Sequence, residues 1–267
     1  MPDDREELLL MDFVEAAAEA ARLGGRILQD WSQKFTAWEK GPSDLVTEAD
    51  QSSQEAIFQF LRDQFPDHNF LGEEGLNHSS GDSPYCWIID PLDGTANYVH
   101  RFPYYSVSIG LEKNGELIAG AIYDPTRDEM FLAGLGAGAT RNGEPISPSS
   151  VETVSNALCL ASLPSKVDRD HPAVKKFVAM LEVAQVVQRT GSAALNLCAI
   201  ACGRADVFWA ERLNPWDMAA GVLIVQEAGG RVTKSDGTRF QVRQPTLLAT
   251  NGILKRDELI EKLQTAG

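Results

Sequence analysis

The segment 87–97 holds the residues best suited to do chemistry in this sequence, and it reads WIIDPLDGTAN. An apolar run ends at Asp90, Pro91 forces a turn because it lacks a backbone N–H donor, and Asp93 follows three residues later. Two carboxylates on a rigid turn are ligands that hard cations such as Mg²⁺ prefer. The next residues, 94–96, could begin a short helix whose free N–H groups would face a phosphate. The segment predicts a metal site beside an anion site, the alternative being an ordinary turn with a capping aspartate.

Two further acidic residues could join this site. Glu73 lies in a GEEG turn that follows the short apolar run 69–71, and Asp217 lies in NPWD at the start of an apolar helix. Taken singly, Glu73 is typical of a solvated turn, and Asp217 is typical of a favourable charge at a helix N-terminus. Together with 87–97 they supply acids from separated parts of the chain, as a two-metal site requires.

The elements that must position these residues follow from hydrophobic periodicity. Thr47 and Asp50 resemble a capping box at the start of a helix, and Asn114-Gly115 is a strong hairpin signal between two alternating runs. We expect helices at 6–31, 47–65, 172–181, 192–202 and 215–227, and strands at 69–71, 86–89, 106–113, 116–123, 205–208, 231–233 and 246–249. This order indicates an α+β half (1–145) with most metal ligands and an α/β half (146–267) with Asp217, packed as one compact unit.

Composition and charge narrow the class of protein. The chain has 267 residues and a net charge of −14, which argues against nucleic acid or an anionic membrane as the main partner. A phosphorylated substrate would also be repelled unless cations neutralised some carboxylates. No apolar run approaches the roughly 20 residues of a membrane span, and the acidic start is unlike a signal peptide. Four scattered cysteines fit a reducing compartment, so we expect a cytoplasmic protein.

Four motifs, in order, resemble the inositol monophosphatase family. They are DLVTEAD at 44–50, GEE at 72–74, DPLDGT at 90–95 and PWDMAAG at 215–221, and the likeness extends from about residue 10 to 260. The resemblance implies a layered α-β-α-β-α sandwich of the inositol monophosphatase and sugar phosphatase type. It also implies a homodimer, inhibition by lithium, and magnesium-dependent hydrolysis of a small-molecule phosphate monoester.

The resemblance also assigns roles to individual residues. It implies two or three Mg²⁺ ions per site, which activate a water molecule and stabilise the leaving ester oxygen. A first ion would be held by Glu73, Asp90 and the carbonyl of Leu92, a second by Asp90, Asp93 and Asp217, and a third would share Glu73. The remaining implied roles are catalysis by Glu73, Thr95 and Asp50, phosphate binding by Asp93, Gly94 and Thr95, and substrate binding by Gly191, Ser192, Ala193 and Glu211.

One position departs from the pattern of the inositol-specific members. These carry a Glu seven residues before the residue matching Asp217, whereas this chain has Ala210 there and Glu211 next to it. The loss of a partner for a substrate hydroxyl lowers discrimination between polyols. Inositol monophosphate is therefore one candidate substrate. The enzyme alternatives are fructose 1,6-bisphosphate, histidinol phosphate, NADP(H) and, less favoured, a nucleoside bisphosphate. The alternatives of another class are a regulatory binding protein and a structural metal-binding protein.

Overall fold

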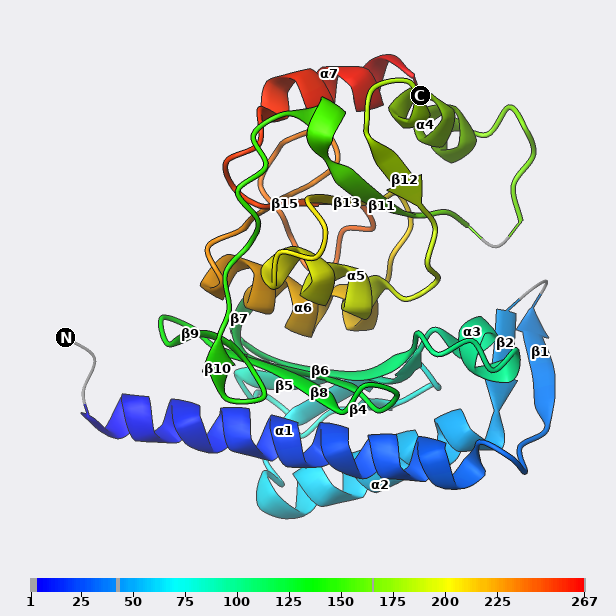
Figure 1. Cartoon of the computed structure of the whole chain (residues 1–267). Coiled ribbons are helices and arrows are strands. Elements are labelled where there is room, and N and C mark those ends of the chain that lie inside the picture. Colours follow the sequence, from blue (N-terminus) through cyan, green and yellow to red (C-terminus); the bar gives the residue numbers. More distant parts are fainter. Residues whose placement is uncertain (1–3, 42–43, 165, 267) are drawn as a thin grey trace.

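Two β-sheets alternate with three layers of helices in the computed structural model of this chain (Figure 1). The structure describes residues 4–41, 44–164 and 166–266, so the outer bounds 1 and 267 of the predicted halves lie outside it. From bottom to top in Figure 1 the layers are α1 with α2, a large sheet, α5 with α6, a smaller sheet, and α4 with α7. The α-β-α-β-α sandwich predicted from the resemblance is confirmed.

The first sheet has eight strands in the order β10-β9-β8-β7-β6-β5-β3-β4, and only β3 and β5 are parallel. Its outer face is covered by α1 and α2, and a two-stranded ribbon of β1 and β2 lies beside α3. The elements are α1 (Asp4–Trp31), β1 (Ala37–Gly41), β2 (Asp44–Thr47), α2 (Glu48–Gln64), β3 (Asn69–Gly72), β4 (Asn77–His78), β5 (Tyr85–Asp93), α3 (Thr95–Val99), β6 (Ser106–Lys113), β7 (Glu116–Asp124), β8 (Glu129–Gly134), β9 (Gly138–Arg141) and β10 (Glu144–Pro145).

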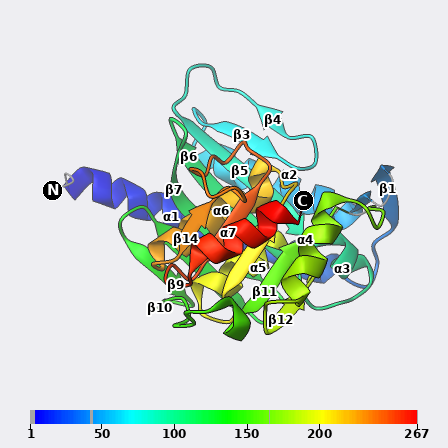
Figure 2. The same cartoon turned by 90° about the horizontal axis from the view of Figure 1, so that it is seen from above.

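The second sheet has five strands in the order β12-β11-β13-β15-β14, of which β12, β11 and β13 are parallel. Seen from above, α4 and α7 lie over this sheet, and β3 and β4 extend beyond it (Figure 2). The elements are a 3₁₀ turn (Val154–Asn156), β11 (Leu158–Ser162), α4 (Pro172–Leu181), β12 (Val186–Gln188), α5 (Ala193–Ala201), β13 (Val207–Ala210), α6 (Pro215–Glu227), β14 (Arg231–Thr233), β15 (Leu247–Thr250) and α7 (Arg256–Thr265). The division into halves at residue 145 stays a prediction.

The local signals of the sequence correspond to real elements. Thr47 caps α2 in a full capping box with Asp50, and Asn114 and Gly115 both have positive φ in the β6–β7 turn. The predicted strand 86–89 is too short, because β5 continues through Pro91 to Asp93 across a register shift against β6. The predicted strand 205–208 is displaced, because β13 runs from Val207 to Ala210.

Small residues set the height of α6 above the large sheet. A Cβ on Gly110 of β6 would lie 2.8 Å from the Cβ of Ala219, and one on Gly120 of β7 would lie 3.0 Å from the Cα of Ala220. Both distances are too short for a side chain, so α6 can approach the sheet this closely only because these strand positions are glycine. The close packing brings the first turn of α6, with Asp217, down to the end of β5.

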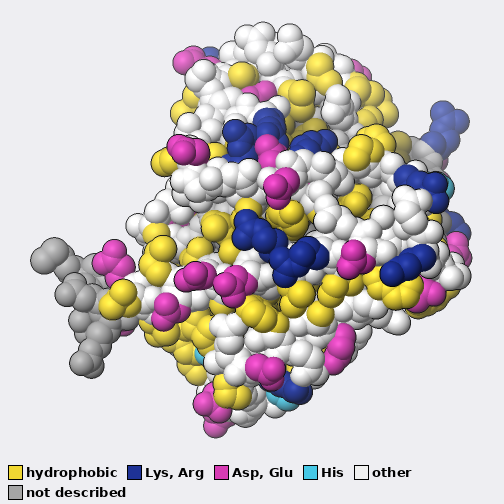
Figure 3. Space-filling view, turned by 60° about the horizontal axis from the view of Figure 1, so that its bottom comes forward, with side chains coloured by type: hydrophobic (Ala, Val, Ile, Leu, Met, Phe, Trp, Pro, Cys, Tyr) yellow, Lys and Arg dark blue, Asp and Glu magenta, His cyan; other side chains and the backbone are white. Residues whose placement is uncertain are grey.

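The net charge of −14 is unevenly spread over the surface. Figure 3 shows Lys and Arg side chains gathered in the central part of one face, with Asp and Glu scattered around them. Exposed ion pairs such as Arg204 with Glu129 account for part of the basic charge. Part of the surface is therefore locally basic although the whole chain is acidic.

Candidate active site

The register of β3 and β5 brings Glu73 beside Asp90. The two strands are parallel, and Gly72 lies opposite Ile89. The next residue of each strand, Glu73 and Asp90, therefore lies at the same edge of the sheet. The backbone N–H of Glu73 donates to the carbonyl of Ile89 at 3.3 Å. Asp90 is buried; its Oδ1 accepts the N–H of Leu92 at 3.0 Å, and its Oδ2 is buried without a hydrogen-bond partner among the described residues.

Asp93 is held by the N-terminus of α5. Its Oδ2 accepts the hydroxyl of Ser192 and the N–H of Ala194 at 2.8 Å, and its Oδ1 accepts the N–H of Ala193 at 3.2 Å. A helix N-terminus carries partial positive charge and unpaired N–H donors, which suit a carboxylate. This arrangement fixes Asp93 across a sequence separation of about a hundred residues.

Asp217 is fixed by a local cap. Asn214 and Asp217 form a capping box at the start of α6, in which Asp217 Oδ2 accepts the N–H of Asn214 at 2.7 Å. Pro215 occupies the first turn, where its missing N–H is not needed. The segment NPWD therefore positions a carboxylate rather than merely starting a helix.

Asp90, Asp93 and Asp217 converge, with one carboxylate oxygen of each lying within 4.8 Å of the others. Burial, followed by the negative charges of Glu73, Asp93 and Asp217, raises the pKa of Asp90 well above its usual range. Burial and then the charge of Asp93 likewise raise the pKa of Asp217. Crowded buried carboxylates are strongly unfavourable without a compensating cation. An all-oxygen donor set with an unpartnered buried oxygen fits a hard divalent cation such as Mg²⁺.

Thr95 and Asp50 form the predicted pair. The hydroxyl of Thr95 lies 3.2 Å from Asp50 Oδ1 and 3.1 Å from the carbonyl oxygen of Leu92. Its single proton can be donated to only one of them at a time. Asp50 also accepts the N–H of Thr47 at 2.8 Å and its hydroxyl at 2.6 Å. Burial raises the pKa of Asp50 to about 6. An acid held between a hydroxyl and a cap is suited to receive a proton.

Two glycines allow the chain segments around this pair to approach closely. Gly94 has φ of +94°, and a Cβ there would lie 3.1 Å from the carbonyl oxygen of Tyr104. Gly191 has φ of +92°, and a Cβ there would lie 2.9 Å from Nδ2 of Asn97. That amide donates to the carbonyls of Tyr104 at 2.7 Å and Thr190 at 2.9 Å. Asn97 thus ties the segment before α5 to the segment carrying Asp93.

Three residues predicted to bind substrate, Ser192, Ala193 and Glu211, contact other parts of the protein. Ser192 and Ala193 are buried and engaged with Asp93. Ala210 is fully buried at the end of β13. The carboxylate of Glu211 is paired with Lys176 Nζ at 2.7 Å and accepts the hydroxyl of Ser235 at 3.4 Å. Their roles in substrate binding stay predictions, and the ion pair leaves Glu211 already engaged.

Gln54 is a positioning residue that the sequence analysis missed. Its amide donates to the carbonyl of Glu74 at 3.1 Å and accepts the N–H of Glu74 at 3.0 Å, which fixes the turn holding Glu73. Gln54 lies one helical turn after Asp50 on the same buried face of α2. That spacing from a buried acid is the signal that could have identified it.

Comparison with known proteins agrees with this geometry. Residues 10–267 match the profile of the inositol monophosphatase family. The chain is 38% identical over 254 residues to an inositol-1-monophosphatase of Synechocystis sp., covering 93% of this chain and 88% of that one. It is 41% identical over 253 residues to inositol monophosphatase 2 of Solanum lycopersicum, covering 91% of this chain and 95% of that one. The crystal structure of extragenic suppressor protein suhB from Bartonella henselae superposes with a TM-score of 0.90 at 34% sequence identity. The superposition covers 96% of this chain and 100% of that one.

The layered fold and the acidic centre between its two sheets are those of a phosphoric monoester hydrolase. The chain belongs to the inositol monophosphatase family, as the resemblance of its motifs indicated. Among the described residues, no helix is both long enough and apolar enough to cross a membrane.

Proposed function

We propose that this protein hydrolyses the phosphate monoester of a small molecule, resembling inositol monophosphate, in a magnesium-dependent reaction. One observation carries the proposal: Asp90, Asp93 and Asp217 converge within 4.8 Å, and an oxygen of Asp90 is buried with no protein partner. This arrangement is costly in the absence of a cation, so it favours a protein that binds a metal ion. Membership of the family supports the same activity.

The residues that would hold magnesium are Glu73, Asp90, the carbonyl of Leu92, Asp93 and Asp217. When bound, two or three Mg²⁺ ions would supply an activated water molecule and stabilise negative charge on the ester oxygens. The protein presents these four carboxylates from three places: Asp90 and Asp93 from β5, Glu73 from the turn after β3, and Asp217 from the start of α6. Lithium would inhibit by competing for one of these positions.

The other residues of the family-like motifs would act on the water and the phosphate. We assign Asp50, through Thr95, to orienting the attacking water and to receiving its proton, because Asp50 is buried and lies 3.2 Å from the hydroxyl of Thr95. The backbone N–H groups of Gly94 and Thr95 would bind the phosphate, as expected at the start of a helix. Glu73 would assist both as a ligand and in catalysis.

The substrate proposal rests on the relatives. In crystals of SaIMPase-II, which is 25–26% identical to this chain, inositol monophosphate is bound in one case and 2′AMP in another. A site that accepts both recognises the phosphate more strictly than the alcohol. With Ala210 buried and Glu211 paired to Lys176, we infer a similarly broad preference here.

Phosphate release from a panel of esters tests the proposal. The panel contains both inositol 1-phosphate enantiomers, fructose 1,6-bisphosphate, histidinol phosphate, NADP and 2′AMP, with magnesium titrated and lithium then added. Magnesium-dependent turnover of inositol phosphate is expected, along with measurable turnover of at least one other ester. A folded, magnesium-loaded protein that releases phosphate from none of them would refute the proposal.

We also propose that the protein is a cytoplasmic homodimer without a nucleic-acid partner. The family resemblance supports the dimer, and light scattering after size exclusion would measure its mass. Cys159 and Cys198 are free and buried, which supports a reducing compartment. The net charge of −14 disfavours nucleic acid.

A further inference from the structure

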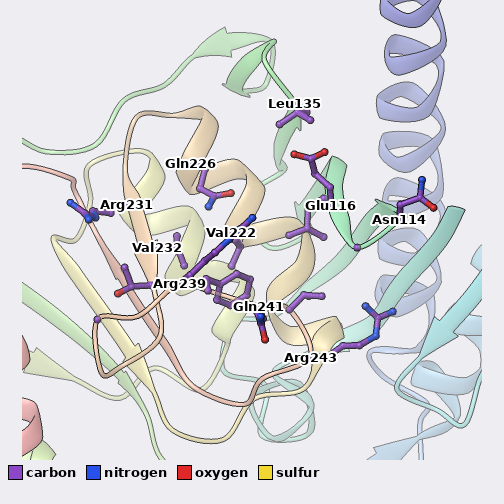
Figure 4. Close-up of a pocket in the computed structure, with 16 residues that line it drawn as sticks. Asn114, Glu116, Leu135, Val222, Gln226, Arg231, Val232, Arg239, Gln241 and Arg243 are labelled. Carbon is purple, nitrogen blue, oxygen red and sulfur yellow. The ribbon is translucent and has the colours of Figure 1, made fainter. Parts of the chain in front are cut away.

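A groove lies on the C-terminal side of α6, away from the acidic centre. Its volume is about 1020 Å³, and it is bounded by the β6–β7 turn, the second half of α6 and the segment 231–243 (Figure 4). Its walls include the side chains of Val222 and Phe240, which provide apolar surface. This volume matches the upper range of small-molecule sites, which is about 300–1,000 Å³.

Three arginines line the groove. Figure 4 shows Arg239 across its middle, with Arg231 and Arg243 on opposite sides. Arg243 pairs with Glu112 at 2.5 Å, whereas Arg231 and Arg239 are exposed and have no ion pair among the residues that the structure describes. Glu116 is the one acidic residue among the lining residues, so Arg231 and Arg239 leave an excess of one positive charge after Arg243 is paired with Glu112. This excess of positive charge belongs to a chain whose net charge is −14.

A tight turn places Arg239 beside a buried hydroxyl that lacks a partner. Lys234 N–H donates to the carbonyl of Thr238 at 3.0 Å, and Thr233 then pairs with Arg239 as an antiparallel bridge. Directly opposed residues of an antiparallel pair place their side chains on the same face. Thr233 is 6% exposed, lines the groove, and its Oγ1 has no hydrogen-bond partner in the described part of the chain.

An unsatisfied buried hydroxyl costs about 1–3 kcal/mol, and native structures rarely keep one without a reason. Arg239, the residue opposite Thr233, carries a guanidinium whose planar pair of donors matches phosphate and carboxylate oxygens. The two groups together present donors to an oxyanion, and the apolar walls could accept a less polar part of the same molecule.

We propose that this groove binds a small organic polyanion, with its phosphate or carboxylate groups on Arg239, Arg231 and Thr233 and its less polar part against Phe240 and Val222. The residues that line the groove include none of those assigned to the acidic centre. Its two residues on α6, Val222 and Gln226, lie five and nine residues after Asp217, a rise of about 7.5 and about 13 Å along the helix axis. The bound molecule is therefore a ligand additional to the substrate.

Isothermal titration of the full-length, magnesium-loaded protein tests the proposal, with ATP, pyrophosphate and citrate as probes. At least one probe is expected to bind, and added salt should weaken the binding. Arg239→Ala should weaken it by about tenfold or more, because a charged hydrogen bond is lost. A preference for ATP or pyrophosphate would indicate a phosphorylated ligand, and a preference for citrate a carboxylated one.

Two matched variants control the experiment. Arg62→Ala removes the same charge on α2, beyond the large sheet, and should leave the affinity unchanged. Asp217→Asn disables the acidic centre but should bind the probe as wild type does, which separates this proposal from the proposed function. If Arg239→Ala does not fold, Thr233→Val replaces it as the test variant. The hydroxyl of Thr233 has no protein partner among the described residues, so its removal breaks no hydrogen bond within the protein. Absence of binding by all three probes, or equal affinity in Arg239→Ala and Arg62→Ala, would overturn the proposal.

Discussion

Asp217→Asn is expected to stabilise the metal-free protein while it removes most of the activity. Asparagine retains an oxygen that can accept the N–H of Asn214, which Asp217 Oδ2 accepts at 2.7 Å, so the cap of α6 survives. The substitution removes one of three carboxylates whose oxygens lie within 4.8 Å of one another. Two unit charges at that separation repel by about 3.5 kcal/mol when the effective dielectric constant is about 20.

The measurable gain is smaller than this repulsion. The pKa values of Asp90 and Asp217 are raised well above their usual range by burial and by neighbouring carboxylates, so partial protonation already relieves the crowding. The lost charge in the first turn of α6 costs about 0.3–1 kcal/mol. We expect a net gain of about 1–2 kcal/mol in the free energy of unfolding, or about 2–4 °C in melting temperature for a chain of this length.

Thermal unfolding followed by circular dichroism, with and without magnesium, measures the effect. Magnesium should raise the melting temperature of wild type, because it binds the folded state, and should raise that of Asp217→Asn less. Phosphate release should fall by about a thousandfold in the variant. Asp63→Asn, an exposed residue of α2 with the same change of charge, should alter neither property. A metal-free Asp217→Asn that melts below wild type would refute the reasoning, because the carboxylates would then not be crowded.

Three further outcomes are expected. Glu73→Gln should shift the magnesium dependence of phosphate release to at least about tenfold higher concentration, and an unchanged titration would remove Glu73 from the ligands. Gly191→Ala should lower kcat and stability, because the new Cβ would lie 2.9 Å from the side-chain amide of Asn97. Gly229→Ala is the control, since Gly229 also has positive φ but a Cβ there would meet nothing within 4 Å. The control therefore measures only the backbone cost, which is about 1–2 kcal/mol. If both variants have the same activity, the close approach at Gly191 has no role in the site. Burial lowers the pKa of His68, so the unfolded chain binds more protons and stability falls as the pH drops through about 6.5. His68→Phe should reduce that fall in urea unfolding between pH 7.5 and 5.5, and an identical pH dependence in both proteins would exclude His68 as its source.

Local chemistry in the sequence pointed to the three carboxylates that converge in the structure, Asp90, Asp93 and Asp217, and the roles assigned to the site residues stay predictions. The capping box of Thr47 and Asp50, the turn from Asp90 to Leu92 within β5, and the cap at Asn214 each depend on neighbouring residues. Long-range contacts were not predictable in this way. The binding of Asp93 by the N-terminus of α5 joins residues about a hundred positions apart, and no local pattern encodes it.

The strands that the sequence analysis missed have a similar physical explanation. β8 and β9 lie on the far side of β7, and both are short, with Gly134 ending β8 and Gly138 beginning β9, so the alternation in each is weak. β11 and β12 are parallel partners separated in the chain by α4, so their pairing is not local in sequence. The arginine groove was missed for the same reason, because Arg239 meets Thr233 only through a turn whose sequence has no catalytic signature.

The acidic centre is oriented by the backbone before any cation binds. Asp90 is held through Oδ1 by the N–H of Leu92, Asp217 through Oδ2 by the N–H of Asn214, and Asp93 by the start of α5. Each donor belongs to a turn or a helix end, where an N–H lacks a regular partner. The fold thus uses its own unpaired donors to hold three repelling carboxylates in place. Because the ligands are already oriented, binding of a divalent cation needs little rearrangement and gains the full relief of their repulsion.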